Sequence, residues 1–155
     1  MKVKKILLFG GIGLAVLSAF GAKKAFDIKS VVEQLKISLG KIHGWPEIYY
    51  PNVRIKIDLL ITNPTQIPLD ISTGGLIKVT KVAVYDGNNG FLGEANIGID
   101  SISVPANGTE PIENVRIQGP IKGILENIYS GGINKDNLRL VTHISALGRE
   151  FTIES

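Results

Sequence analysis

The segment from residue 53 to residue 65 constrains the fold of this chain most strongly. Its apolar side chains recur at every second position, and the positions between them are mostly polar. A period of two places these sets on opposite faces of a β-strand, so one face must be buried. Asn63-Pro64 then ends the strand, because proline has no N–H to donate to a neighbouring strand. The buried set is Val53, Ile55, Ile57, Leu59 and Ile61.

Similar alternation predicts further strands near residues 35–42, 77–85, 91–99, 112–117, 138–144 and 149–153. Residues 86–90, 105–109 and 146–148 carry the turn residues that separate these strands, and residues 121–128 form an amphipathic helix. Seven short strands predict a two-sheet β-sandwich with one short helix over an open edge or end. Beyond the first strand, the predicted core contains Val79, Val115, Ile117, Leu138, Leu140 and Ile144.

The N-terminal segment predicts a membrane anchor. Residues 6–22 contain no charge, and lysines flank the run on both sides. As a helix it would be ~26 Å long, a little less than the ~30 Å hydrocarbon core, and the following lysines can extend the span by snorkelling. The anchoring set is Ile6, Leu7, Leu8, Phe9, Ile12, Leu14, Val16, Leu17, Phe20, Lys23 and Lys24.

We therefore expect a single-pass protein, bound to lipid through residues 6–22, with its C-terminal domain outside the bilayer on the non-cytoplasmic side. The domain boundaries are 1–26 for the anchor, 27–34 for a helical stalk and 35–155 for the sandwich. A virion membrane is an alternative setting. A cleaved signal peptide is another, since Ala19-Phe20-Gly21 fits a cleavage site and would give a secreted domain.

Small residues recur every four positions in this segment, at Gly11, Ala15 and Ala19. They would lie on one helix face and let a second helix approach, which would favour a homo-oligomer. The alternative is that glycine and alanine are simply common in membrane helices.

Charge and cysteine content exclude several classes of function. Residues 1–26 hold five lysines and no acid, which leaves 12 basic and 14 acidic residues in the rest of the chain. The domain is therefore slightly acidic and lacks the basic cluster of a nucleic-acid-binding protein. The absence of cysteine excludes disulfides and cysteine-ligated zinc.

The segment 43–51 is predicted to be a loop, because it contains Gly44 and two prolines. It also contains Trp45, Tyr49 and Tyr50, which would suit an interaction loop for a protein partner. The alternative is that these rings cap the open end of the core. His43 is predicted to be a solvated loop histidine without a partner.

No catalytic, cofactor or metal site is predicted. The chain has no nucleophile elbow, zinc-protease motif or phosphate-binding loop. Asp86, Asn88 and Asn89 are too few ligands for a calcium loop. Glu110 and Glu113 flank a turn, but two acids form a site only if a cleft surrounds them.

The order of motifs resembles the late-embryogenesis-abundant type 2 family, also called the WHy domain, over residues 33–155. The matching features are Asn63-Pro64-Thr65, Pro68, Tyr85, Gly90, Gly93 and the run from Val104 to Thr109. The resemblance implies a fibronectin-type-III-like sandwich behind a membrane helix, with no catalytic residues. The aromatic segment 43–51 lies outside the family pattern.

Two functions remain as hypotheses. One is a non-enzymatic structural protein that tethers a membrane to a protein layer, in a cell envelope or a membrane-containing virion. The alternative, which the resemblance suggests, is a stress-protective module or one that binds lipid or another apolar ligand.

Overall fold

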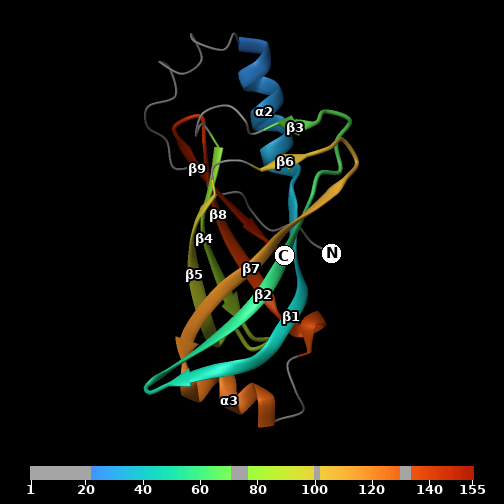
Figure 1. Ribbon diagram of the computed structural model, residues 1–155. Coiled ribbons are helices and arrows are strands. Elements are labelled where there is room, and N and C mark those ends of the chain that lie inside the picture. Colours follow the sequence, from blue (N-terminus) through green and yellow to red (C-terminus); the bar gives the residue numbers. More distant parts are fainter. Residues whose placement is uncertain (1–21, 71–76, 100–101, 130–133) are drawn as a thin grey trace.

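The computed structural model describes residues 22–70, 77–99, 102–129 and 134–155. The helices in these ranges are α2 (Ala22–Gln34), α3 (Ile121–Tyr129) and a short 3-10 turn, η1 (Lys135–Asn137) (Figure 1). The strands are β1 (Lys36–Tyr49), β2 (Asn52–Thr62), β3 (Leu69–Asp70), β4 (Ile77–Tyr85), β5 (Phe91–Ile99), β6 (Ser103–Val104), β7 (Thr109–Pro120), β8 (Arg139–Ala146) and β9 (Arg149–Glu154). The prediction of a mainly β fold with one short helix after the fifth long strand is confirmed.

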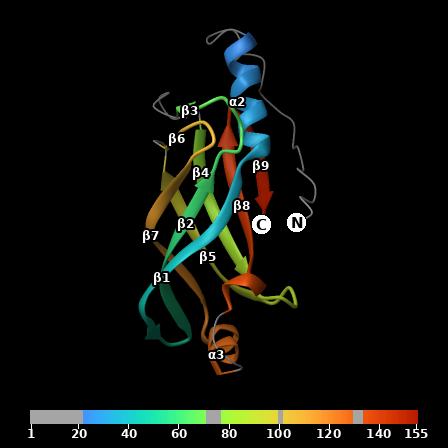
Figure 2. The same ribbon diagram turned by 90° about the vertical axis from the view of Figure 1, so that its right-hand side faces the viewer.

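Seven of these strands form one antiparallel sheet in the order β1-β2-β7-β5-β4-β8-β9, and β3 pairs with β6 separately. The sheet folds over into two layers, β1-β2-β7 and β5-β4-β8-β9, so that β1 also contacts β8 and β9 (Figure 2). Among the described residues, the hydrogen-bonded strand pair that joins the two layers is β5 with β7, where Glu94 pairs with Gln118. The expected two sheets are thus two halves of one sheet.

Two glycines make this junction possible. A Cβ atom on Gly119 would overlap the backbone carbonyl of Leu92, and one on Gly93 would lie 2.8 Å from the carbonyl oxygen of Gln118. Contacts that short do not occur between real atoms, so any side chain here would push the two strands apart. The close crossing of β5 and β7 therefore depends on glycine at both positions.

The core lies between the two layers and matches the predicted inward set. Val53 and Leu59 are completely buried, and the burial of β2 alternates strictly along its 11 residues. Leu138 is the exception among the predicted residues, because it is only half-buried at the edge of the core. Ten of the eleven predicted inward residues are therefore buried, whereas the core residues of α2 and β5 were outside the predicted set.

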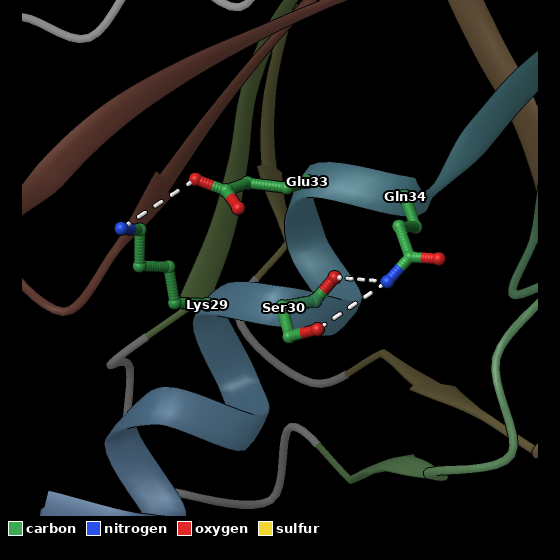
Figure 3. Close-up of polar contacts among 4 residues, drawn as sticks. All are labelled: Lys29, Ser30, Glu33 and Gln34. Carbon is green, nitrogen blue, oxygen red and sulfur yellow. Dashed lines mark hydrogen bonds and ion pairs between the residues drawn. The ribbon is translucent and has the colours of Figure 1, made fainter.

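Helix α2 is part of this core and is not a free stalk. Val31 and Val32 are fully buried and Ile28 nearly so, because the apolar stripe of the helix packs against the end of the sandwich. The solvent side carries an ion pair of 3.8 Å between Lys29 and Glu33 (Figure 3). The helix is therefore packed against the end of the sandwich, and residues 1–21, which precede it in the sequence, lie outside the described ranges.

Asn63 organises the loop that follows β2 at the same end of the molecule. Its side chain is fully buried and donates from Nδ2 to the carbonyl oxygens of Ile67 at 2.8 Å and Val104 at 3.4 Å. Its Oδ1 accepts from the backbone N–H of Thr65 at 3.0 Å and from the Thr65 hydroxyl at 2.7 Å. The Asn-Pro-Thr sequence that predicted a turn thus also ties that turn to β6.

Candidate interaction site

The segment predicted as a loop at residues 43–51 is instead the end of a long β-hairpin. β1 continues through Tyr49, where Ile48 pairs with Val53 and Tyr49 with Asn52, so only Tyr50 and Pro51 form the turn. An irregularity between His43 and Glu47 absorbs the residues that break the strand pattern, with Gly44 at a φ of +63°. Gly44 and Pro46 therefore lie in a bulged edge strand and not in a loop, whereas Pro51 belongs to the turn.

The aromatic side chains of this hairpin tip are exposed. Trp45 is 92% exposed, Tyr50 88% and Ile48 61%. The alternative prediction, that these rings cap the core, is therefore wrong for Trp45 and Tyr50. We call the four residues Trp45, Ile48, Tyr49 and Tyr50 the aromatic tip.

The aromatic tip lies at the opposite end of the sandwich from α2 (Figures 1 and 2). Lys36, which follows the helix closely, pairs with Thr62 at the far end of β2, and Tyr49 pairs with Asn52 at the tip. The 11 residues of β2 span ~35 Å at ~3.3 Å per residue. The tip and the helix are therefore separated by the length of the domain.

Tyr49 is held in place by polar contacts on β2. The Arg54 guanidinium lies 5.0 Å from the centre of the Tyr49 ring, and its Nη2 donates to the phenol oxygen at 3.5 Å. Glu47 joins them, with carboxylate oxygens 3.7 Å from Arg54 and 3.3 Å from Lys56. These contacts order one aromatic ring of the tip and leave Trp45 and Tyr50 free to contact a partner.

Helix α3 supports the turn from below. The backbone N–H of Ile121, at the start of the helix, donates to the carbonyl oxygen of Pro51 at 3.1 Å. Asn52 pairs with Pro120, so β7 also borders the turn. The tip is thus connected to two neighbouring elements in addition to its own hairpin.

His43 was predicted to be a histidine without a partner, and this is wrong. Its Nε2 lies 2.7 Å from Oδ1 of Asp58, although the approach is not that of a well-aligned hydrogen bond. Asp58 sits between two bulges, one in β1 after Leu39 and one in β7 around Asn114. The pair is created by strand register, which the residues around His43 alone do not reveal.

Asp58 is ionised more readily than an ordinary aspartate. The backbone N–H of Asn114 donates to its Oδ1 at 3.0 Å, and this hydrogen bond is the main cause of a lowered pKa. The neighbouring His43 and the charge of Lys41 lower the pKa further, against a partial burial that raises it. Asp58 on the outer face of β2 therefore stays a carboxylate to a lower pH than an ordinary aspartate does.

The remaining sequence predictions concern other parts of the chain. The predicted anchor residues from Ile6 to Phe20 lie outside the described residues, as do the small residues Gly11, Ala15 and Ala19. The backbone of Lys23 and Lys24 is described, but their side chains are not. None of the helices within the described ranges has the length and apolar content that crossing a bilayer requires.

Two hollows were not foreseen from sequence. An open surface hollow of ~340 Å³ is bordered by Ser103, Glu110 and Glu113, and Glu113 is exposed there, so the hollow does not surround the two acids. A small one of ~40 Å³ lies between the layers and is lined only by apolar side chains from both layers. In the described ranges, no group of three or more His, Asp or Glu side chains is placed to hold a metal ion.

Comparisons with known proteins do not assign this chain to a family. A scan against protein-family models finds no match, and a search of curated proteins finds none. One solved structure that matches is an uncharacterized β-sandwich protein from Clostridium difficile, with 14% sequence identity. The match covers 77% of this chain and 84% of that chain with a TM-score of 0.26, which is too low to support an argument.

Proposed function

We propose that this protein is a membrane-anchored, non-enzymatic β-sandwich that tethers a membrane to a protein layer through the aromatic tip. The observation that carries the proposal is the exposure of Trp45 and Tyr50 at the end of the domain opposite to α2. The apolar segment 6–22 precedes α2, so the anchor and the contact surface would lie at opposite ends of a rigid spacer.

The composition of the tip suits a protein contact. Trp, Tyr and Arg are the residues that most often dominate binding energy at protein interfaces. Tyr49 and Arg54 are already ordered against each other, which reduces the entropy lost on binding. An exposed Trp and an exposed Tyr beside such an ordered pair would supply the large apolar contacts.

A photo-reactive residue in place of Ile48 tests this proposal in native membranes. Ile48 is 61% exposed within the aromatic tip, so we expect cross-links to one abundant protein. The matched control carries the same label at Lys78, an exposed position on β4 in the other layer. Absence of any cross-link specific to the tip label would contradict the proposal.

Two further variants test the aromatic tip and the membrane anchor separately. Combining Trp45→Ala with Tyr50→Ala should weaken the contact by about 30-fold or more, which is the loss of ~2 kcal/mol expected if only one of the two is a hot-spot residue. Deletion of residues 1–26 should release the domain from membranes, whereas persistent membrane association would contradict the anchor.

The second candidate function is the binding of an apolar ligand, which the apolar hollow between the layers favours. Its volume of ~40 Å³ is far below the ~300 Å³ at which ligand pockets begin, so the layers would have to separate. A hydrophobic dye tests this idea: saturable binding that Leu138→Trp abolishes would support it, since Leu138 lines the hollow. No saturable binding would remove it.

A further inference from the structure

A row of basic side chains crosses the outer face of β1, β2 and β7 above the aromatic tip. His43 lies directly opposite Lys56 in the β1–β2 pair, and Lys56 lies directly opposite Arg116 in the β2–β7 pair. Directly opposed residues share a face, and like charges in that arrangement destabilise a sheet. Lys56 and Arg116 therefore cost the isolated domain some stability.

The neighbouring carboxylates neutralise this row only in part. Glu47 is shared between Lys56 and Arg54, and Asp58 is engaged by His43 and a backbone N–H. Arg116 is exposed, and no ion pair to it is found within the described ranges. Lys41, Arg54, Lys56 and Arg116 thus outnumber Glu47, Asp58 and Glu113, the last of which is exposed beside Asn114 on β7.

The position of the row indicates how a partner would lie. Lys56 is four residues from Asn52 at the turn, which corresponds to ~13 Å along the strand. An end-on approach to a bilayer buries only ~5–10 Å, so it would cover Tyr49 and Tyr50 but leave uncovered both the row and Trp45, which lies between the His43–Lys56 and Glu47–Arg54 pairs. A protein lying side-on along β1, β2 and β7 would contact both.

We infer that the partner of the aromatic tip is a protein with an acidic contact surface, which lies along the outer face of β1, β2 and β7 and neutralises the basic row. This inference rests on the proposed function, because it names the chemistry of the partner at the same tip. It gives a role to the two cations, Lys56 and Arg116, that lie opposite each other on an otherwise slightly acidic domain.

Fluorescence of Trp45 provides the test, because it is the single tryptophan of the chain. The full-length protein in phosphatidylcholine nanodiscs is titrated with poly-L-glutamate while the emission of Trp45 is recorded. We expect saturable binding that weakens with added salt, since exposed charges are screened beyond ~8 Å at physiological ionic strength.

Arg116→Glu is the decisive variant, and Lys78→Glu is its control with the same change in charge. Arg116→Glu should weaken poly-L-glutamate binding about tenfold, whereas Lys78→Glu on the other layer should leave it unchanged. Because Arg116→Glu removes a like-charge pair, it should also raise the midpoint of thermal unfolding. A lower midpoint, or equal weakening by both variants, would overturn the inference.

Two outcomes distinguish the partner classes. Binding to phosphatidylglycerol vesicles with no response to poly-L-glutamate would overturn the inference in favour of an anionic lipid surface. Cross-links from the Ile48 label that keep their full yield in Arg116→Glu would also overturn it, yet leave the tethering function intact. Loss of those cross-links in Arg116→Glu, with retention in Lys78→Glu, would support both.

Discussion

Replacement of Asn63 tests the reading that one buried side chain holds the α2 end of the sandwich together. Asn63→Ala removes three hydrogen bonds of 3.0 Å or less, one to Ile67 and two to Thr65. At ~1 kcal/mol each, with ~1 kcal/mol for a backbone group left unpaired, the loss is about 3–5 kcal/mol. This is a large share of the ~5–15 kcal/mol that stabilises a typical domain.

The assay is urea unfolding followed by circular dichroism, because Trp45 is exposed and reports poorly on the core. Asn88→Ala is the matched control: its side chain is exposed in the 86–90 turn, and we expect a change within about 0.5 kcal/mol. A decrease in the free energy of unfolding of less than about 1 kcal/mol for Asn63→Ala would refute the reasoning, because removing a buried, fully hydrogen-bonded amide should cost more than that.

Asn63→Asp adds a pH dependence to the same test. A carboxylate at this position would face the carbonyl oxygens of Ile67 and Val104, so burial and repulsion would raise its pKa above the ordinary ~3.9. The penalty is then absent in strong acid and grows as the pH rises above ~3.9, where the unfolded chain releases the proton first. The variant should therefore approach wild-type stability near pH 3 and be least stable at neutral pH.

Three further predictions concern the junction, the acid pair and the tip. Gly119→Ala should destabilise the fold by about 3 kcal/mol, because its methyl group meets a backbone carbonyl of β5, whereas Gly98→Ala meets open space; equal urea midpoints would contradict this. Because the pKa of Asp58 is lowered in the folded protein, its carboxylate stabilises the fold at pH values above ~3.9, the pKa of an unfolded aspartate. This stabilisation is lost as the pH falls below that value, so Asp58→Asn should lose less stability than wild type between pH 6 and pH 3. Asp136→Asn is the control for that comparison, and an identical acid profile for Asp58→Asn and wild type would contradict it. Acrylamide should quench Trp45 nearly as well as free indole, since the ring is 92% exposed; strong protection would show that the tip is covered.

Much of the core was predictable because a period of two in β2, β7 and β8 is a local property of the sequence. The turn at residues 86–90 was also predictable, since Asp86 accepts N–H groups of its own turn and Asn89 has a φ of +63°. The stripe that begins at Ile28 correctly predicted a helix. The burial of this helix against the sandwich could not be predicted, because an apolar helix face does not indicate which other element it packs against.

The candidate site was found only in part. Trp45, Tyr49 and Tyr50 were identified by residue type. Gly44 and the two prolines led to the prediction of a loop, so the strand that carries Trp45 and Tyr49 was missed. Counting the register outward from a two-residue turn at Tyr50 and Pro51 would have placed His43 directly opposite Asp58, whereas the bulge between His43 and Glu47 sets it opposite Lys56 with Asp58 still in contact.

The junction of the two layers could not be predicted from the local sequence pattern. Gly93 and Gly119 are far apart in the sequence, and only the crossing of β5 and β7 shows why neither can carry a side chain. The basic row was hidden for the same reason, since Lys56 and Arg116 become neighbours only through the β2–β7 pairing.

The bulges of β1 also affect whether this protein aggregates when many copies are packed at high density. β1 is an outer strand of the sheet, and a long, regular outer strand recruits the same strand of another copy into aggregates. Here the ladder is interrupted after Leu39 and again after His43, and Pro46 lacks an N–H to offer. Copies packed side by side at high density would therefore find no continuous edge on β1 along which to polymerise.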